Sequence, residues 1–330
     1  MKRAILIAAS CTVLIGVPGG ASAQVFPSKP IRIIVSTSPG GLTDLISRNS
    51  GQSVTESTGQ PVVVEYRPGA GTLIGFQACA KAPPDGYTVC VTTPESIVYN
   101  PLLYAKLPYD PENDFVAVTN LATGVGGVIV AHPSAPGNNF AEMIAYAKAN
   151  PGALNYATWG SGSVPGIFLG WINYANGVNI TPVPYKGAGP SLPAIVAGQV
   201  HLTYSAIGLV APHVKAGKLK LLAVAGTKRS PFVPDTPSLA EFNSDPGLNS
   251  YFAMWAPVKT PMLVVERLAA EFGKAVHSER MKELLKTQAL IPVGNSPAEF
   301  AAFLKEDKAN ASRIFKAIGI RPGDAPPLSQ

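Results

Sequence analysis

Three loops rich in glycine and serine carry the residues best suited to ligand binding. The first, Ser36-Thr37-Ser38-Pro39-Gly40-Gly41-Leu42-Thr43-Asp44, leaves an apolar run and opens an amphipathic one. Adjacent glycines let a ligand approach the backbone closely, and the start of a helix offers unpaired N–H groups at a positive dipole end. The segment therefore predicts a carboxylate or phosphate site. The alternative is a plain turn with Thr43 or Asp44 as the helix cap.

Two later loops repeat this arrangement. They are Thr158-Trp159-Gly160-Ser161-Gly162-Ser163 and Pro184-Tyr185-Lys186-Gly187-Ala188-Gly189-Pro190-Ser191. Each of the three loops follows a predicted strand. If these strands are parallel, the loops lie at their carboxyl ends, where α/β sheets bind ligands. Their only charged residues are Asp44 and Lys186. Binding through neutral dipoles and hydroxyls suits a reversible anion receptor and suits a hydrolase poorly.

Signals for catalysis and for a metal are weak. Gly69, Gly71 and Gly75 only approximate a dinucleotide fingerprint, and there is no P-loop. Neither Ser161 nor Ser163 lies in a nucleophile elbow. Four histidines show no metal-binding spacing: His132, His201, His213 and His277. We therefore expect no cofactor and no metal, and a Ser–His pair assembled from distant segments remains the alternative.

The elements around the loops alternate between strands and helices. Strands are predicted at 31–35, 62–65, 87–92, 127–131, 154–157, 181–185, 201–205, 219–225 and 251–256. Helices are predicted at 43–58, 72–82, 140–149, 167–175, 191–197, 261–290 and 297–318. Strand–helix–strand units at this spacing indicate parallel sheets with helices on both faces. We predict two α/β lobes, residues 24–126 plus 250–330 and residues 127–249.

The composition is that of a folded chain and excludes a disordered tail protein, a collagen and a coiled coil. The 330 residues include 32 Gly and 32 Pro, about a fifth of the chain, which is below the level typical of disorder. The chain has 26 Lys and Arg residues and 20 Asp and Glu residues, so its formal net charge is 26 − 20 = +6. The basic residues are scattered singly, the densest spots being Lys218-Leu219-Lys220 and Lys228-Arg229, so we expect no nucleic-acid partner.

The first 23 residues have the pattern of a signal peptide. Lys2 and Arg3 precede an apolar run, and Ala21-Ser22-Ala23 forms a cleavage site. We expect cleavage after Ala23, export to the periplasm and a mature chain that begins at Gln24. A membrane anchor is disfavoured because the run is short and interrupted by glycine and proline. Acylation at Cys11 is a further alternative.

Two cysteines remain after cleavage, Cys79 near the end of a predicted helix and Cys90 in the next strand. In an oxidising compartment two cysteines often pair. The sequence leaves a disulfide and two buried thiols as equal alternatives.

An ordered set of short motifs runs through the mature chain. Examples are Pro39-Gly40-Gly41-Leu42-Thr43-Asp44, Lys81-Ala82-Pro83-Pro84-Asp85-Gly86-Tyr87-Thr88 and Pro234-Asp235-Thr236-Pro237-Ser238. The others lie at 26–32, 59–65, 67–71, 107–111, 183–187, 197–200 and 215–219. Together they resemble the Bug-type (TctC-like) extracytoplasmic solute receptors of the tripartite tricarboxylate transporter family, over residues 26–322.

The resemblance implies a two-lobed periplasmic-binding-protein (Venus-flytrap) fold that closes on a small carboxylate in a cleft between the lobes. It implies delivery to a permease of two membrane subunits, and we expect a monomer. Carried over, the first-lobe site is Ser38, Gly40, Gly41 and Thr43. The second-lobe site is Ser161, Gly162, Ser163, Tyr185, Lys186 and Ser205. Trp159 would stack on an aromatic acid or lie in the core.

The chain departs from the family pattern at Leu42, near Pro165, at His201 and at Ser205, and the last of these bears on the ligand. Ser205 stands where the family often has an acid, which argues against a ligand with an ammonium group. A binding protein for another transporter or sensor system stays open, as does a secreted serine hydrolase built on Ser163.

Overall fold

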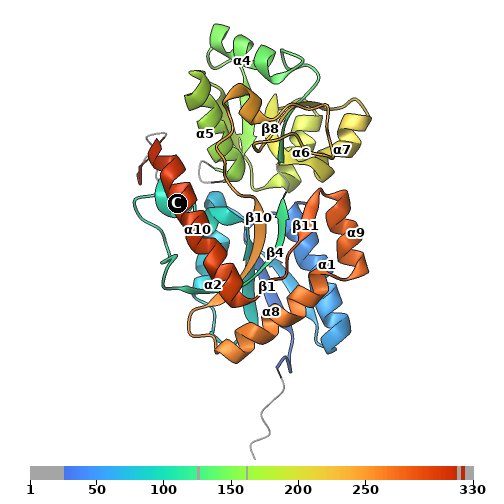
Figure 1. Ribbon diagram of the computed structural model, residues 1–330, viewed down its shortest axis with the longest axis vertical. Helices are drawn as coiled ribbons and strands as arrows, with labels where there is room; N and C mark the ends of the chain where they lie inside the picture. Colours follow the sequence, from blue (N-terminus) through green and yellow to red (C-terminus); the bar gives the residue numbers. More distant parts are fainter. Residues whose placement is uncertain (1–25, 125–126, 161–162, 318–320, 324–330) are drawn as a thin grey trace, which may run out of the picture.

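The computed structural model describes residues 26–124, 127–160, 163–317 and 321–323. Its described residues form two stacked lobes, each built on one β-sheet (Figure 1). The strands of the first sheet are β1 (Ile31–Val35), β2 (Val62–Tyr66), β3 (Thr88–Thr92), β4 (Phe115–Gly124), β10 (Tyr251–Pro257) and β11 (Leu290–Pro292). Their order in space is β11-β4-β10-β3-β1-β2.

The first sheet is mixed, whereas the sequence predicted a parallel one. Strand β1 runs parallel to β2 and to β3. Strand β10 lies between β3 and β4 and is antiparallel to both, and β11 is antiparallel to β4. Since β10 brings the chain back from the second lobe, it enters the sheet from the opposite end.

Helices cover both faces of this sheet. On one face lie α1 (Leu42–Thr58), α8 (Met262–Val276) and α9 (Glu279–Thr287), and on the other α2 (Leu73–Ala80) and α10 (Pro297–Ala317), with the short α3 (Asn100–Leu103) nearby. The alternation of side chains along β1 explains the two cores. Ile33 and Val35 pack with α1 and α8, and Ile34 packs with α2.

The second sheet has the order β7-β6-β8-β5-β9. Its strands are β5 (Gly127–Ala131), β6 (Asn155–Thr158), β7 (Thr181–Pro184), β8 (Leu202–Ala206) and β9 (Lys220–Val224). Strand β6 is parallel to β7 and β8, and β5 is antiparallel to β8 and β9. The helices α4 (Phe140–Ala149) and α5 (Val164–Asn176) cover one face, and α6 (Ala188–Val196) and α7 (Ile207–Lys215) cover the other.

The two chain crossings between the lobes lie side by side. Ser250, just before β10, accepts hydrogen bonds from the amide of Gly124 at 2.8 Å and from the hydroxyl of Thr123 at 3.0 Å. Both donors are at the end of β4, so the outgoing and returning strands are fastened to each other at the lobe boundary.

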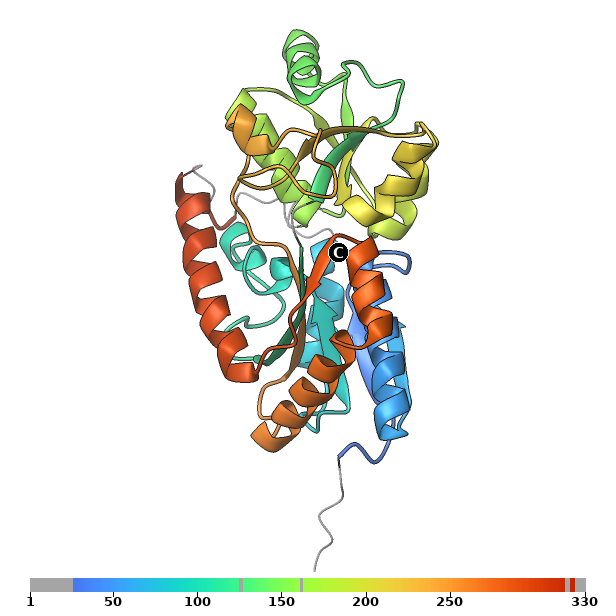
Figure 2. The same ribbon diagram turned by 45° about the vertical axis from the view of Figure 1, so that its right-hand side comes forward.

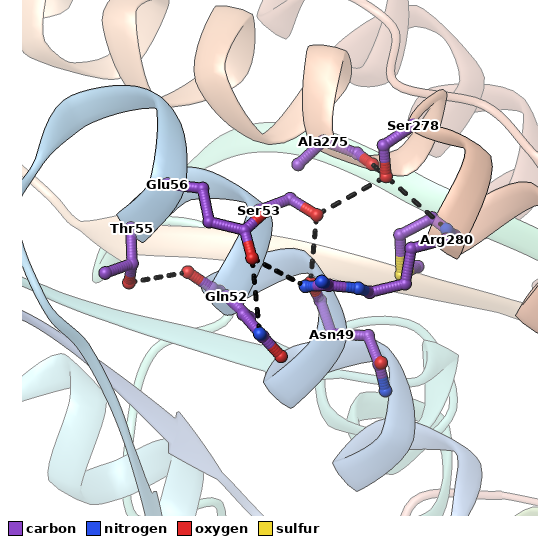
Figure 3. Close-up of polar contacts among 10 residues, drawn as sticks. Asn49, Gln52, Ser53, Thr55, Glu56, Ala275, Ser278 and Arg280 are labelled. Atoms are coloured by element: carbon purple, nitrogen blue, oxygen red, sulfur yellow. Dashed lines mark hydrogen bonds and ion pairs between the residues drawn. The ribbon is translucent and has the colours of Figure 1, made fainter.

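The single helix predicted at 261–290 is wrong: it is two helices, α8 and α9, followed by β11. Ser278 ends the first and caps the second, because its hydroxyl accepts from the amide of Met281. Figure 3 shows how α9 is fastened to α1: Arg280 donates to Glu56 at 3.0 Å and the Ser278 and Ser53 hydroxyls lie 3.3 Å apart. Strand β4 and helix α7 were not predicted.

A disulfide joins Cys79 in α2 to Cys90 in β3, with a Cα–Cα distance of 6.1 Å. This is one of the two states that the sequence left open. Within the part of the chain that the structure describes, no helix combines the length and apolar character needed to cross a bilayer. The predicted signal peptide, residues 1–23, lies outside the described residues.

Candidate functional site

The loop after β1 and the loop after β7 touch each other across the lobe boundary (Figure 2). Ser38 donates two hydrogen bonds to the carbonyl oxygen of Lys186, from its amide at 3.1 Å and from its hydroxyl at 2.7 Å. The approach depends on small residues. A methyl group on Gly189 would collide with the carbonyl oxygen of Pro39. The structure therefore shows the lobes in direct contact.

Asp44 organises the first loop from inside the protein. Its carboxylate is fully buried and accepts from the amide of Gly40 at 2.8 Å, from the hydroxyl of Tyr66 at 2.6 Å and from Arg48 at 2.8 Å. Burial and the bond to Asp44 raise the pKa of Tyr66 to about 12. The negative charge also lies in the first turn of α1, where it is favourable.

Ser163 caps helix α5. Its hydroxyl accepts from the amides of Gly166 at 3.2 Å and Trp159 at 3.1 Å, and donates to the carbonyl of Gly160 at 2.6 Å. All three partners are backbone groups, so this side chain shapes the loop after β6. The predicted residues Ser161 and Gly162 of the same loop lie outside the described residues.

A cavity of about 70 Å³ lies between the lobes at the strand ends, and four predicted residues line it: Gly41, Thr43, Trp159 and Ser205. Ser38, Gly40, Tyr185 and Lys186 lie instead in the two touching loops, where Tyr185 donates through its amide to Thr158 and Gly40 to Asp44. The cavity wall is apolar where α1, α7, β10 and β11 meet, through Leu42, Leu209, Phe252 and Leu290.

Glu95 is a cavity residue that the sequence analysis missed. It lies in the 3₁₀ turn η2 (Pro94–Ser96), directly after β3, and is fully buried. Its Oε1 accepts from the amide of Val164, the first residue of α5, at 3.3 Å. Burial raises the pKa of Glu95. The rule applied to β1, that parallel strands present ligand loops at their carboxyl ends, would have found it had it been applied to β3.

The described lining of this cavity contains no lysine, arginine or histidine. Its polar side chains carry hydroxyls, an indole N–H, an amide and a carboxyl group, and they belong to Thr37, Thr43, Thr93, Glu95, Trp159, Tyr204, Ser205, Ser250 and Gln288. The described residues also hold no cluster of three or more metal-ligating side chains. Such a surface can bind a small polar solute reversibly through hydrogen bonds.

A larger cavity of about 320 Å³ adjoins the first and shares Gly124, Val164, Tyr204 and Ser250 with it. It lies beside the chain crossings and is lined on one side by Lys228 and Arg229, both exposed. The smaller cavity is the better candidate site, because it lies where the strand ends and the helix N-termini of the two lobes meet.

Two α/β lobes that meet at their strand ends around a polar cavity define a class: the two-lobed periplasmic solute-binding proteins. The fold class predicted from the sequence is therefore confirmed. Within that class the chain belongs to the tripartite tricarboxylate transporter family receptors, whose model matches residues 46–320. The predicted family is confirmed, and with it the prediction of a receptor that is not an enzyme.

Three similar proteins illustrate the match. A UPF0065 protein of Bordetella pertussis is 32% identical over 326 residues, which cover 98% of this chain and 100% of that protein. The structure of R. palustris Rpa4515 with adipate is 30% identical, with a TM-score of 0.83 over 90% of this chain and 99% of the other. The periplasmic binding protein BugD is 29% identical, with a TM-score of 0.84 over 90% and 100%.

Proposed function

We propose that this chain is a periplasmic receptor that captures a small carboxylate in the cavity between its lobes. The observation that carries the proposal is the cavity itself, placed at the N-terminus of α1 and lined by neutral donors from both lobes. The first amides of a helix have no partner within the helix. A related receptor, Rpa4515, has been solved with adipate.

The roles of the lining residues follow from their positions. The first-turn amides of α1 and the hydroxyl of Thr43 hold the carboxylate from the first lobe. Ser205, at the end of β8, completes its hydrogen bonds from the second. Trp159 supplies an apolar wall. The solute binds one lobe first, and closure then adds the contacts of the other, including the two bonds between Ser38 and Lys186.

The domain organisation fits this mechanism. We propose that residues 24–126 and 250–330 form the first lobe and residues 127–249 the second. The strands of the first sheet all fall in the first set and those of the second sheet in the other, which supports the division. We also propose that the receptor is a monomer, that residues 1–23 are removed and that the solute is delivered to a permease of two membrane subunits. Light scattering tests the oligomeric state, and mass spectrometry of the exported protein tests the start at Gln24.

Calorimetry and thermal shift against aliphatic and aromatic mono-, di- and tricarboxylates test the proposal, using mature protein that has been unfolded and refolded to remove any bound solute. At about 100 times its Kd, a ligand stabilises the native state by roughly 2.7 kcal/mol, a shift of several degrees. We expect one carboxylate to bind saturably and to be recovered unchanged. A silent panel, or conversion of the solute, would refute the proposal.

Two substitutions locate the site. Thr43→Val and Ser205→Ala each remove a hydroxyl from the cavity wall. Since a hydrogen bond to a charged group contributes about 1.5–3 kcal/mol, each should weaken binding by roughly tenfold or more. Thr58→Val, at the far end of helix α1, is the matched control and should leave Kd unchanged.

A further inference from the structure

The segment that returns from the second lobe changes its hydrogen-bond partners at Gly247. The amide of Gly247 donates to Oδ2 of Asp245 at 3.2 Å, and Oδ1 of the same carboxylate accepts at 2.9 Å from the amide of Gly226, just after β9 of the second lobe. The carbonyl oxygen of Gly247 instead accepts at 3.2 Å from the side chain of Asn310, in α10 of the first lobe. The two sides of one residue are therefore bonded to different lobes.

Beyond Gly247 the returning segment is bonded to the first lobe. The side-chain amide of Asn249 donates to Oδ1 of Asp307 at 2.6 Å, and its carbonyl oxygen accepts from the hydroxyl of Tyr99 at 2.7 Å. The hydroxyl of Tyr251 donates to the other oxygen of Asp307 at 3.0 Å. Asp307 lies in α10, which runs along the first lobe to the lobe boundary (Figures 1 and 2), and is 2% exposed. Its carboxylate thus ties this segment to the first lobe, although the division proposed above counts residues 248 and 249 with the second.

The backbone of Gly247 is suited to rotation. Its φ is +69°, in the left-handed region that favours glycine. A methyl group there would have only Ile314 within 4 Å, at 3.8 Å, so the conformation and not crowding favours glycine. Pro246 before it has a φ fixed by its ring. Hinges in two-lobed proteins are a few such loop residues that absorb large changes in φ and ψ.

We propose that Gly247 is the pivot of the returning crossing when the lobes open and close, and that Asp307 is the positioning residue that fixes the first-lobe side of this pivot. Rotation at Gly247 changes the angle between the lobes, because the chain is bonded to a different lobe on each of its sides. The proposal rests on the lobe closure described under the proposed function. It does not depend on the identity of the solute.

A distance measurement between the lobes tests the pivot in refolded mature protein without added solute. Spin labels at Lys148→Cys in α4 and Lys274→Cys in α8 report one distance by pulsed electron paramagnetic resonance. Both lysines are exposed, and the native Cys79 and Cys90 are joined in a disulfide and take no label. We expect two distances, one for the arrangement in which the lobes touch and one for an open arrangement.

Gly247→Ala should shift the population toward the open distance. The left-handed conformation disfavours an alanine by roughly five- to thirtyfold in population. We therefore expect the ratio of closed to open protein to fall by at least about fivefold. Gly217→Ala is the matched control, because Gly217 also has a φ of +69° and an added methyl group meets nothing within 4 Å, but it lies just after α7 inside the second lobe. Its distance distribution should equal that of wild type.

Asn249→Ala tests the role of Asp307. It removes the bond to the buried carboxylate, and because Asn249 is exposed the fold is kept. Both distance peaks should broaden, since the first-lobe side of the pivot is no longer fixed. Asn113→Ala is the control: Asn113 is exposed and also donates to an aspartate, Asp110, at 2.8 Å, away from the crossings. A purely structural role would lower Tm and leave the peak widths unchanged.

The outcomes are decisive for each part. Equal distributions in Gly247→Ala and Gly217→Ala, or a single unchanged distance in wild type and every variant, would overturn the pivot. Peaks in Asn249→Ala as narrow as those in Asn113→Ala would overturn the role of Asp307. A carboxylate panel without any binding would refute the proposed solute and leave these distances as they are, so the two proposals fail separately.

Discussion

The carbonyl oxygen of Lys186 accepts two hydrogen bonds from Ser38, from the amide at 3.1 Å and from the hydroxyl at 2.7 Å. The acceptor lies in the loop after β7 and the donors lie in the loop after β1, so the contact forms only when the two lobes meet. The pair therefore stabilises the closed arrangement, and the strength of solute binding depends on it.

Gly189→Ala should weaken solute binding by preventing this contact. The added methyl group would collide with the carbonyl oxygen of Pro39, a backbone atom that cannot rotate away. We expect a Kd at least about tenfold higher, equivalent to 1.4 kcal/mol, and a larger radius of gyration in X-ray scattering with solute present. Gly170→Ala is the control, since a methyl group there meets nothing within 4 Å. Unchanged affinity and compactness in Gly189→Ala would show that the contact is dispensable.

Asp44→Asn should destabilise the protein and loosen the first loop. The amide cannot accept from Gly40, Tyr66 and Arg48 together, and losing bonds to a buried carboxylate costs roughly 2–4 kcal/mol. Denaturant unfolding measures this cost. The control is Asp85→Asn, which breaks the exposed ion pair with Lys29 and should cost at most about 1 kcal/mol.

The same substitution should change the titration of Tyr66. Its pKa is raised to about 12 by burial and then by the bond to Asp44, so Asp44→Asn should lower it part of the way toward 10. Titration by NMR, with Tyr66→Phe to assign the signal, measures the shift. An unmoved pKa would mean that burial alone accounts for it.

Reduction of the disulfide between Cys79 and Cys90 should lower stability. The bridge closes a loop with a sequence separation of 11. The chain-entropy relation gives about 3 kcal/mol for a loop of this length, a fall in Tm of roughly 5 °C or more. Thermal unfolding with and without reductant measures it. The double variant Cys79→Ala, Cys90→Ala is the control, because its Tm should not respond to reductant; a response there would assign the effect elsewhere.

The Glu241 carboxylate should make stability sensitive to acid. Its bonds to Arg229 and then to the amide of Ser238 lower its pKa from 4.5 to about 2. A pKa depressed on folding stabilises the native state above the unfolded value, and the contribution is lost as pH falls from about 4.5 toward 2. The Tm difference between wild type and Glu241→Gln should therefore shrink over this window. Glu283→Gln, on the exposed surface of α9, is the reference variant. If the Tm difference between wild type and Glu241→Gln stays constant over this pH window, the prediction is contradicted.

Strands with a clear local pattern were predictable, and elements defined by distant contacts were not. Strand β1 and helix α4 have the predicted bounds because their apolar periodicity is strong. Strand β4 was missed because its middle contains the polar residues Thr119 and Asn120. The Thr119 hydroxyl and the Asn120 backbone amide donate to Asn295, about 175 positions later, a contact that no local pattern shows. Ser278, within 261–290, is a residue type that caps helices, and it does cap α9. The apolar pattern of this stretch nevertheless favoured one continuous helix.

The candidate site shows the same division. Gly41, Thr43, Trp159 and Ser205 were chosen for their loops and do line one cavity. Glu95 was not chosen because the rule on strand ends was applied to β1 and not to β3. It is fully buried, and it accepts a hydrogen bond from the start of α5 in the second lobe, a contact between distant segments that the sequence does not show.

The position of β10 sets an order for assembly of the chain. Strand β4 joins β3 and the rest of the parallel strands only through β10, which comes about 130 residues later. The strands β5 to β9, by contrast, are consecutive in the chain and can pair as soon as that stretch is available. The first sheet therefore cannot be completed until β10 follows the strands of the second sheet along the chain. Until β10 pairs with it, β4 has an unpaired edge that is open to aggregation.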